Sequence, residues 1–109
     1  MSIRLVLADA HPLILAGLQY VIDREADLQV LACCRDGEDA LQAVRQQRPD
    51  VLILDFRLPG KDGWAVLDEL AREACSVRVV LLTDALDVEE ALQASRLALF
   101  QYAHAHGLL

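Results

Sequence analysis

The chain has 109 residues, of which 55% are hydrophobic and 25% charged, and its formal net charge is −7. This length and composition predict one folded domain with a substantial core, and the acidic balance argues against direct binding to nucleic acid, which needs clustered Lys and Arg. No apolar run approaches the roughly 20 residues that span a bilayer, and the N-terminus lacks the pattern of a signal peptide, so we expect a cytoplasmic protein without membrane contact.

The first half of the sequence alternates between strand and helix patterns. Ile3–Ala8 is a short run of branched apolar residues, typical of a strand covered on both faces, and Asp9 ends it. Apolar residues then recur at helical spacing from Pro12, a residue that suits a first helical turn. A second strand is expected over Leu28–Cys33, followed by a helix that Pro49 cannot continue.

The second half repeats this alternation. Val51–Leu54 is a third apolar strand, ended by Asp55, and the loop LPGKDG and another helix follow it. Val77–Leu82 is the fourth strand. Asp87 is placed as the N-cap of a further helix. Strands that alternate with helices of this length predict βαβ units and a parallel sheet.

Three of the predicted strands end in a polar residue: Asp9, Asp55 and Thr83. In an open α/β sheet, ligands bind at the carboxyl edge of the strands, where these side chains would meet. Two carboxylates and a hydroxyl there can hold a hard cation such as Mg²⁺, and a carboxylate can also accept a phosphoryl group. The alternative is that each aspartate only caps the turn or helix that follows it.

Three segments give a specific family resemblance: LVLADAHPLILAGL, RPDVLILDFRLPGKDGWAVL and VRVVLLTD. They resemble the first strand, the phospho-acceptor segment and the fourth strand of NarL/FixJ-type response regulator receiver domains. The likeness covers residues 2–94 of a single domain spanning 1–109, with 95–109 as an atypical tail. It implies a flavodoxin-like, doubly wound parallel sheet with the strand order 2-1-3-4.

The resemblance also implies roles for individual residues. Asp55 would accept phosphate from a sensor histidine kinase, and Thr83 would act as the switch residue. Asp9, Asp55 and the backbone carbonyl of Arg57 would bind Mg²⁺, while His11 would be structural. The domain would thereby control an attached DNA-binding output domain without being an enzyme itself.

The sequence departs from the family pattern at the metal site. The family has an acidic pair after the first strand, and here the pair is Asp9-Ala10. Mg²⁺ demands near-ideal oxygen coordination, so we expect its binding to be weak without the second acid. Asp84 is an alternative source of a carboxylate, and solvent exposure of Asp84 is an equally good reading.

The family lysine is also missing from its expected place. It lies at the end of the fifth strand and pairs with the phosphoryl oxygens, but the single lysine here is Lys61. Counting from Thr83, the family position falls on Ala105. The flanking residues His104 and His106 could offer a donor, or could bind a stray metal.

The C-terminal segment SRLALFQYAHAHGLL favours helix over strand, because alanine, leucine and glutamine are good helix formers. We therefore expect one helix from Asp87 to about His106, with the fourth strand at an open sheet edge. Such an edge favours dimerisation. Tyr102 stands where the family has its switch aromatic residue, which leaves a fifth strand open.

Two further functions are weighed against a signalling receiver. A degenerate receiver that acts as an interaction module without phosphorylation is favoured by Ala10 and by the missing lysine. An enzyme of the haloacid-dehalogenase type needs a second aspartate two residues after the nucleophile, where this chain has Arg57. A dinucleotide-binding domain is disfavoured because no glycine-rich turn follows the first strand.

Overall fold

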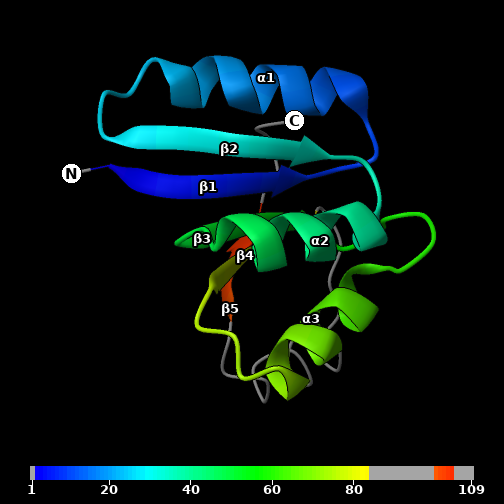
Figure 1. Cartoon of the computed structure of the whole chain (residues 1–109). Helices are drawn as coiled ribbons and strands as arrows, with labels where there is room; N and C mark the ends of the chain where they lie inside the picture. Colours follow the sequence, from blue (N-terminus) through cyan, green and yellow to red (C-terminus); the bar gives the residue numbers. More distant parts are fainter. Residues whose placement is uncertain (1, 84–99, 105–109) are drawn as a thin grey trace.

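The structure, a computed structural model, describes residues 2–83 and 100–104 and forms a parallel α/β sheet with helices on both faces (Figure 1). The elements, in chain order, are β1 (Ile3–Ala8), α1 (Pro12–Asp23), β2 (Leu28–Cys34), α2 (Gly37–Gln47), β3 (Val51–Asp55), α3 (Gly63–Arg72), β4 (Arg78–Thr83) and β5 (Phe100–His104). The strands lie in the order β2-β1-β3-β4-β5, and every adjacent pair is parallel. The predicted order 2-1-3-4 is confirmed. Within the described ranges, no helix has the length and apolar character needed to cross a membrane.

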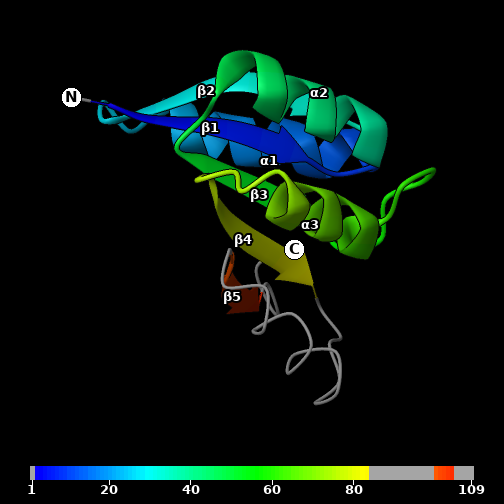
Figure 2. The same ribbon diagram turned by 60° about the horizontal axis from the view of Figure 1, so that its bottom comes forward.

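The side chains of successive strand residues point to opposite faces of the sheet. Leu5 and Leu7 of β1 pack with Leu15 and Ile22, so α1 covers one face. The other face carries α2 and α3, as Figures 1 and 2 show from two directions. The central strands are therefore covered on both sides, which explains their nearly continuous apolar sequence.

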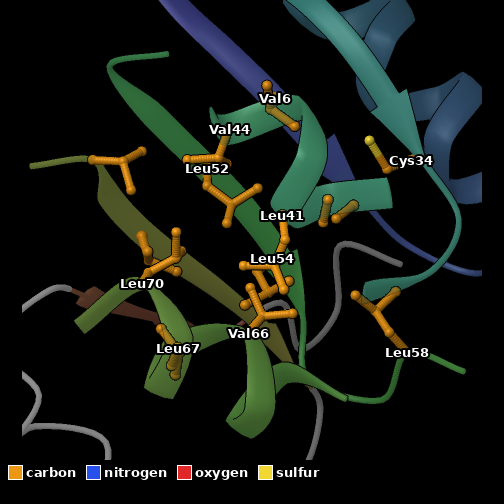
Figure 3. Packing of buried hydrophobic residues seen from close by; sticks show 14 of the residues in the cluster. Val6, Cys34, Leu41, Val44, Leu52, Leu54, Leu58, Val66, Leu67 and Leu70 are labelled. Atoms are coloured by element: carbon orange, nitrogen blue, oxygen red, sulfur yellow. The ribbon is translucent and has the colours of Figure 1, made fainter. Parts of the chain in front are cut away.

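The larger core lies between the sheet and the two helices α2 and α3 (Figure 3). Its fully buried side chains come from β1, β3, β4 and both helices: Val6, Ala40, Leu41, Leu52, Leu54, Val66, Leu67, Leu70, Val79 and Leu81. Leu52 and Leu54 point into this core from β3, directly before Asp55. The strand that carries Asp55 is thus anchored by packing on both sides of the sheet.

The helix boundaries follow from local signals in the sequence. Pro12 occupies the first turn of α1, and Asp36 and Asp62 cap α2 and α3 by accepting hydrogen bonds from the backbone N–H three residues on. Arg48 ends α2 in the left-handed conformation with φ 47°, directly before Pro49.

The structure corrects the prediction of a helix that extends to about residue 106. Residues 100–104 form β5, which pairs with β4 from Val79↔Phe100 to Thr83↔His104. Without β5, the outer edge of β4 would leave its backbone N–H and C=O groups without sheet partners. Pairing with these groups outweighs the preference of residues 100–104 for helix, which is a few tenths of a kcal/mol per residue. Residues 84–99, with the predicted N-cap Asp87, lie outside the described residues. Since β5 pairs with β4, the expectation of an open β4 edge was also wrong.

Candidate functional site

Asp9 stands directly after β1 at the carboxyl edge of the sheet, and only 4% of it is exposed. Its Oδ1 accepts a hydrogen bond from the backbone N–H of His11 and lies 2.8 Å from His11 Nδ1. Burial of a carboxylate is costly unless it is paired or bound to a cation. The partners of Asp9 are therefore central to what this edge can do.

Asp55 is the last residue of β3 and is half-buried beside Asp9. Its Oδ1 accepts a hydrogen bond of 3.1 Å from the backbone N–H of Arg57. Burial raises the pKa of the Asp55 carboxyl above its ordinary value, and the negative charge of Asp9 adds to this effect. The hydrogen bond from Arg57 opposes the rise.

Asp9, His11 and Asp55 converge, since their ligand atoms all lie within 4.8 Å of one another. Two carboxylates this close repel each other, and a divalent cation between them would relieve the repulsion. The sequence places Asp9 and Asp55 at a common edge, as found here. It assigns His11 a structural role, and a D-x-H pattern directly after a strand is the signal that could have placed His11 in the cluster.

The hydrogen bonds show the alternative reading, in which each aspartate caps the turn that follows it. Asp9 and Asp55 each use Oδ1 to cap the turn that follows, through the backbone N–H two residues on. Among the described residues, neither carboxylate has a hydrogen-bond partner at its second oxygen, Oδ2. The side chain of Ala10 offers no ligand atom and packs against the larger core.

The loop between β3 and α3 is held by close backbone contacts. The N–H of Gly63 donates to the carbonyl of Phe56 at 2.8 Å, and a Cβ on Gly63 would lie 2.8 Å from the Phe56 Cα. The rings of Phe56 and Trp64 meet edge to face, with centroids 4.9 Å apart. Since Arg57 is next to Phe56, these contacts fix the backbone that carries the Arg57 carbonyl.

Lys61 secures the far end of this loop to both neighbouring helices. Its Nζ lies 2.6 Å from Glu69 Oε2 on α3 and 3.2 Å from Glu38 Oε2 on α2. These two carboxylates raise the pKa of the Lys61 ammonium. A Cβ on Gly37 would collide with the Lys61 carbonyl, so α2 begins in backbone contact with the loop. Lys61 is therefore engaged between α2 and α3 rather than with either aspartate.

Thr83 is the last residue of β4, one position beyond Leu82, which is the register partner of Asp55. The backbone thus places Thr83 at the same edge of the sheet as Asp55, while its side chain lies outside the described residues. Asp84, Ala105 and His106 also lie outside them. Of the two histidines next to the expected lysine position, only the backbone of His104 is described, as the register partner of Thr83.

Comparison with known proteins supports the family resemblance. The model of the response regulator receiver domain family matches residues 5–104. The chain is 36% identical over 81 residues to the uncharacterized transcriptional regulatory protein YvfU of Bacillus subtilis, covering 74% of this chain and 40% of that protein. It is 33% identical over 81 residues to the oxygen regulatory protein NreC of Staphylococcus epidermidis, with 73% of this chain and 37% of that protein covered.

Other relatives join a similar segment to a different activity. A protein-glutamate methylesterase/protein-glutamine glutaminase of Myxococcus xanthus is 39% identical over 101 residues, and the match covers 89% of this chain and 29% of that protein. The chain therefore spans about two fifths or less of the curated relatives it matches.

Among solved structures, the signal receiver domain of NarL from Mycobacterium tuberculosis superposes with a TM-score of 0.84 at 29% identity. That match covers 93% of this chain and 83% of the other.

Proposed function

The chain belongs to the response regulator receiver domain family, and from this premise we propose that Asp55 accepts a phosphoryl group from a sensor histidine kinase. The observation that carries the proposal is the position of Asp55. Its carboxylate stands at the end of a strand packed on both faces, beside the buried carboxylate of Asp9. A site built on a rigid strand holds its reacting atoms more accurately than a site on a loop.

The hydrogen bonds suggest which oxygen of Asp55 reacts. Oδ1 accepts the Arg57 N–H, so Oδ2 is the oxygen available to attack phosphorus. In the transfer, a bond forms between Oδ2 and the phosphoryl phosphorus while the bond from phosphorus to the donor breaks. The Arg57 hydrogen bond holds the carboxylate in orientation for this step.

We infer that Mg²⁺ is the cation of this step, held by Asp9, Asp55 and the backbone carbonyl of Arg57. Mg²⁺ would neutralise charge on the phosphoryl oxygens. The donor set fits in part: two oxygen ligands converge and the loop that bears Arg57 is fixed, but Ala10 supplies no third carboxylate. We therefore expect Mg²⁺ to bind weakly. Thr83, at the end of β4, is the proposed switch residue that responds to phosphate.

The test is phosphorylation by a small-molecule donor. The domain is incubated with Mg²⁺ and acetyl phosphate, and intact mass is measured for the wild type, Asp55→Asn and the control Asp50→Asn. One added phosphoryl group in the wild type and the control, absent from Asp55→Asn, supports the proposal. Equal labelling of Asp55→Asn would contradict it. Thermal unfolding with and without beryllium fluoride gives a second readout of the same site.

The second candidate is a degenerate receiver that binds partners without phosphorylation. Two observations favour it: Ala10 stands where the family has its second acid and packs against the larger core, and the ammonium of Lys61 is engaged by Glu38 and Glu69. No mass gain and no beryllium fluoride effect at millimolar Mg²⁺ would favour this candidate.

The wider role is part of the same proposal. The domain controls a DNA-binding output domain in the cytoplasm, as in a transcriptional regulator, and does not itself bind DNA or catalyse turnover of a substrate. Self-association is supported by the exposed apolar residues of α1, now that β5 pairs with β4. Leu13, Tyr20 and Val21 are 85%, 65% and 62% exposed on this helix. Light scattering coupled to size exclusion, with Leu13→Glu as the comparison, tests this part.

A further inference from the structure

The strongest feature not used by the proposed function is the imidazole of His11. It comes from the residue that precedes α1, and its Nδ1 lies 2.8 Å from Asp9 Oδ1. Both atoms belong to the cluster with Asp55, in which every ligand atom lies within 4.8 Å of the others. The residue between the two donors, Ala10, contributes only apolar packing.

We propose that this edge binds a divalent first-row transition metal, with His11 Nδ1 as a direct ligand beside Asp9 and Asp55. The inference deepens the proposed function and rests on it for the location of the cation site. It concerns which cation the site selects: an acidic pair after β1 would favour Mg²⁺, whereas Asp9 together with the imidazole of His11 favours a softer ion.

The spacing of the donors supports this assignment. Two neighbouring ligands of an octahedral ion, each at about 2.0–2.1 Å, lie about 3 Å apart. The 2.8 Å between His11 Nδ1 and Asp9 Oδ1 is close to that edge length. Binding requires the tautomer with the imidazole proton on Nε2, and a rotation of the ring that turns the Nδ1 lone pair from Asp9 Oδ1 towards the ion. The backbone N–H of His11 would continue to hold Asp9.

The backbone around His11 limits the motion that binding would require. His11 precedes Pro12, which restricts its backbone to the extended region, and its φ of −97° and ψ of 109° lie there. The side chain is 65% exposed while that of Asp9 is 5% exposed. The ion would therefore rest on a buried carboxylate and be reached from solvent on the imidazole side, with water as the partner of Nε2.

The donor chemistry decides the class of ion. Imidazole suits Zn²⁺, Ni²⁺ and Co²⁺, whereas Mg²⁺ takes oxygen ligands in near-ideal octahedral geometry and keeps its waters. Every nitrogen and oxygen site prefers later transition metals to some degree. The distinguishing property is therefore not tighter binding alone but dependence of that binding on His11.

The experiment measures binding of Co²⁺, Ni²⁺ and Mg²⁺ by calorimetry to the metal-free domain. The variants are His11→Ala, Ala10→Asp and the double variant His104→Ala/His106→Ala, with folding checked by urea titration. Loss of a residue that hydrogen-bonds to a metal ligand typically lowers metal affinity by about 10–100-fold. Loss of a direct ligand in His11→Ala should therefore weaken Co²⁺ and Ni²⁺ binding by roughly tenfold or more. Mg²⁺ binding should be unchanged in His11→Ala and tighter in Ala10→Asp.

A spectroscopic readout does not depend on affinity. Electron spin-echo spectra of bound Cu²⁺, a paramagnetic ion that imidazole also suits, should show coupling to an imidazole ¹⁴N in the wild type and in the double variant, and none in His11→Ala. Unchanged Co²⁺ and Ni²⁺ affinity in His11→Ala, or ¹⁴N coupling that disappears only with His104 and His106, would overturn the proposal. None of these measurements uses a phosphodonor. They therefore test the metal site whether or not Asp55 can be phosphorylated.

Discussion

Replacement of Asp55 by asparagine should stabilise the metal-free domain. The carboxylates of Asp9 and Asp55 have oxygens no more than 4.8 Å apart. At that distance two unit charges repel by about 1 kcal/mol at the dielectric of water and by about 3 kcal/mol at an effective dielectric of 20. Because Asp55 is only half-buried, the lower part of this range applies. Asparagine keeps the oxygen that accepts the Arg57 N–H, so the change removes charge with little loss of hydrogen bonding.

The effect should depend on pH in a defined direction. Burial and Asp9 raise the pKa of Asp55 in the folded state above its ordinary value of 3.8, so ionisation of Asp55 costs stability. The advantage of Asp55→Asn should be absent below that ordinary value, grow as the pH rises through the raised folded pKa, and be complete above it. Divalent cation should reduce the advantage, because it stabilises the wild type.

The assay is urea unfolding followed by circular dichroism in EDTA, at pH 8 and near pH 4. Asp68→Asn is the matched control, since Asp68 is half exposed on α3 and paired with Arg72. Its loss should change stability little. A stability of Asp55→Asn equal to or below that of the wild type at pH 8 would refute the reasoning, as would an advantage that persists unchanged at the acid end.

Three other predictions follow from contacts of the fold. Gly63→Ala should destabilise the domain by about 1–3 kcal/mol, because its Cβ would lie 2.8 Å from the Phe56 Cα. Gly17→Ala should stabilise the domain by about 0.5–1 kcal/mol, because Gly17 lies in α1 and nothing lies within 4 Å of the added Cβ. Both variants are measured in the same urea assay, and stability changes of the same sign would contradict the prediction. Lys61→Met should leave acetyl phosphate labelling of Asp55 intact, since its ammonium pairs with Glu38 and Glu69; abolished labelling in a folded protein would show a role at the phosphate. Burial raises the pKa of both Cys33 and Cys34, that of Cys34 to about 11, but only Cys33 is exposed. In a Cys75→Ser background, Ellman's reagent at pH 8 should therefore lose its fast phase in Cys33→Ser and keep it in Cys34→Ser.

The sheet was predictable from the sequence because its strands are short apolar runs bounded by turn residues. The run before Asp55 shows this: Leu52 and Leu54 are fully buried in one core, while Val51 and Ile53 face α1. The convergence of Asp9 and Asp55 followed from the rule that parallel strands share a carboxyl edge.

Two features could not be predicted from these sequence patterns. The segment Phe100–His104 consists of residues that tolerate helix, and its strand state depends on pairing with β4, a partner distant in sequence. The approach of His11 to Asp9 depends on the turn between β1 and α1, where the extended backbone before Pro12 directs the imidazole. The strand state of residues 100–104 is set by tertiary pairing and the position of His11 by the local geometry of the turn, so helix and strand propensities alone predict neither.

The central claim is that Asp55 itself carries the phosphoryl group. The most direct measurement treats the acetyl-phosphate-labelled domain with borohydride, which reduces an aspartyl phosphate to homoserine, and maps the product by peptide mass spectrometry. The account predicts homoserine at position 55 and at no other aspartate. Homoserine at Asp9 or another aspartate, or an unmodified Asp55 in a domain that has gained phosphate, would contradict it.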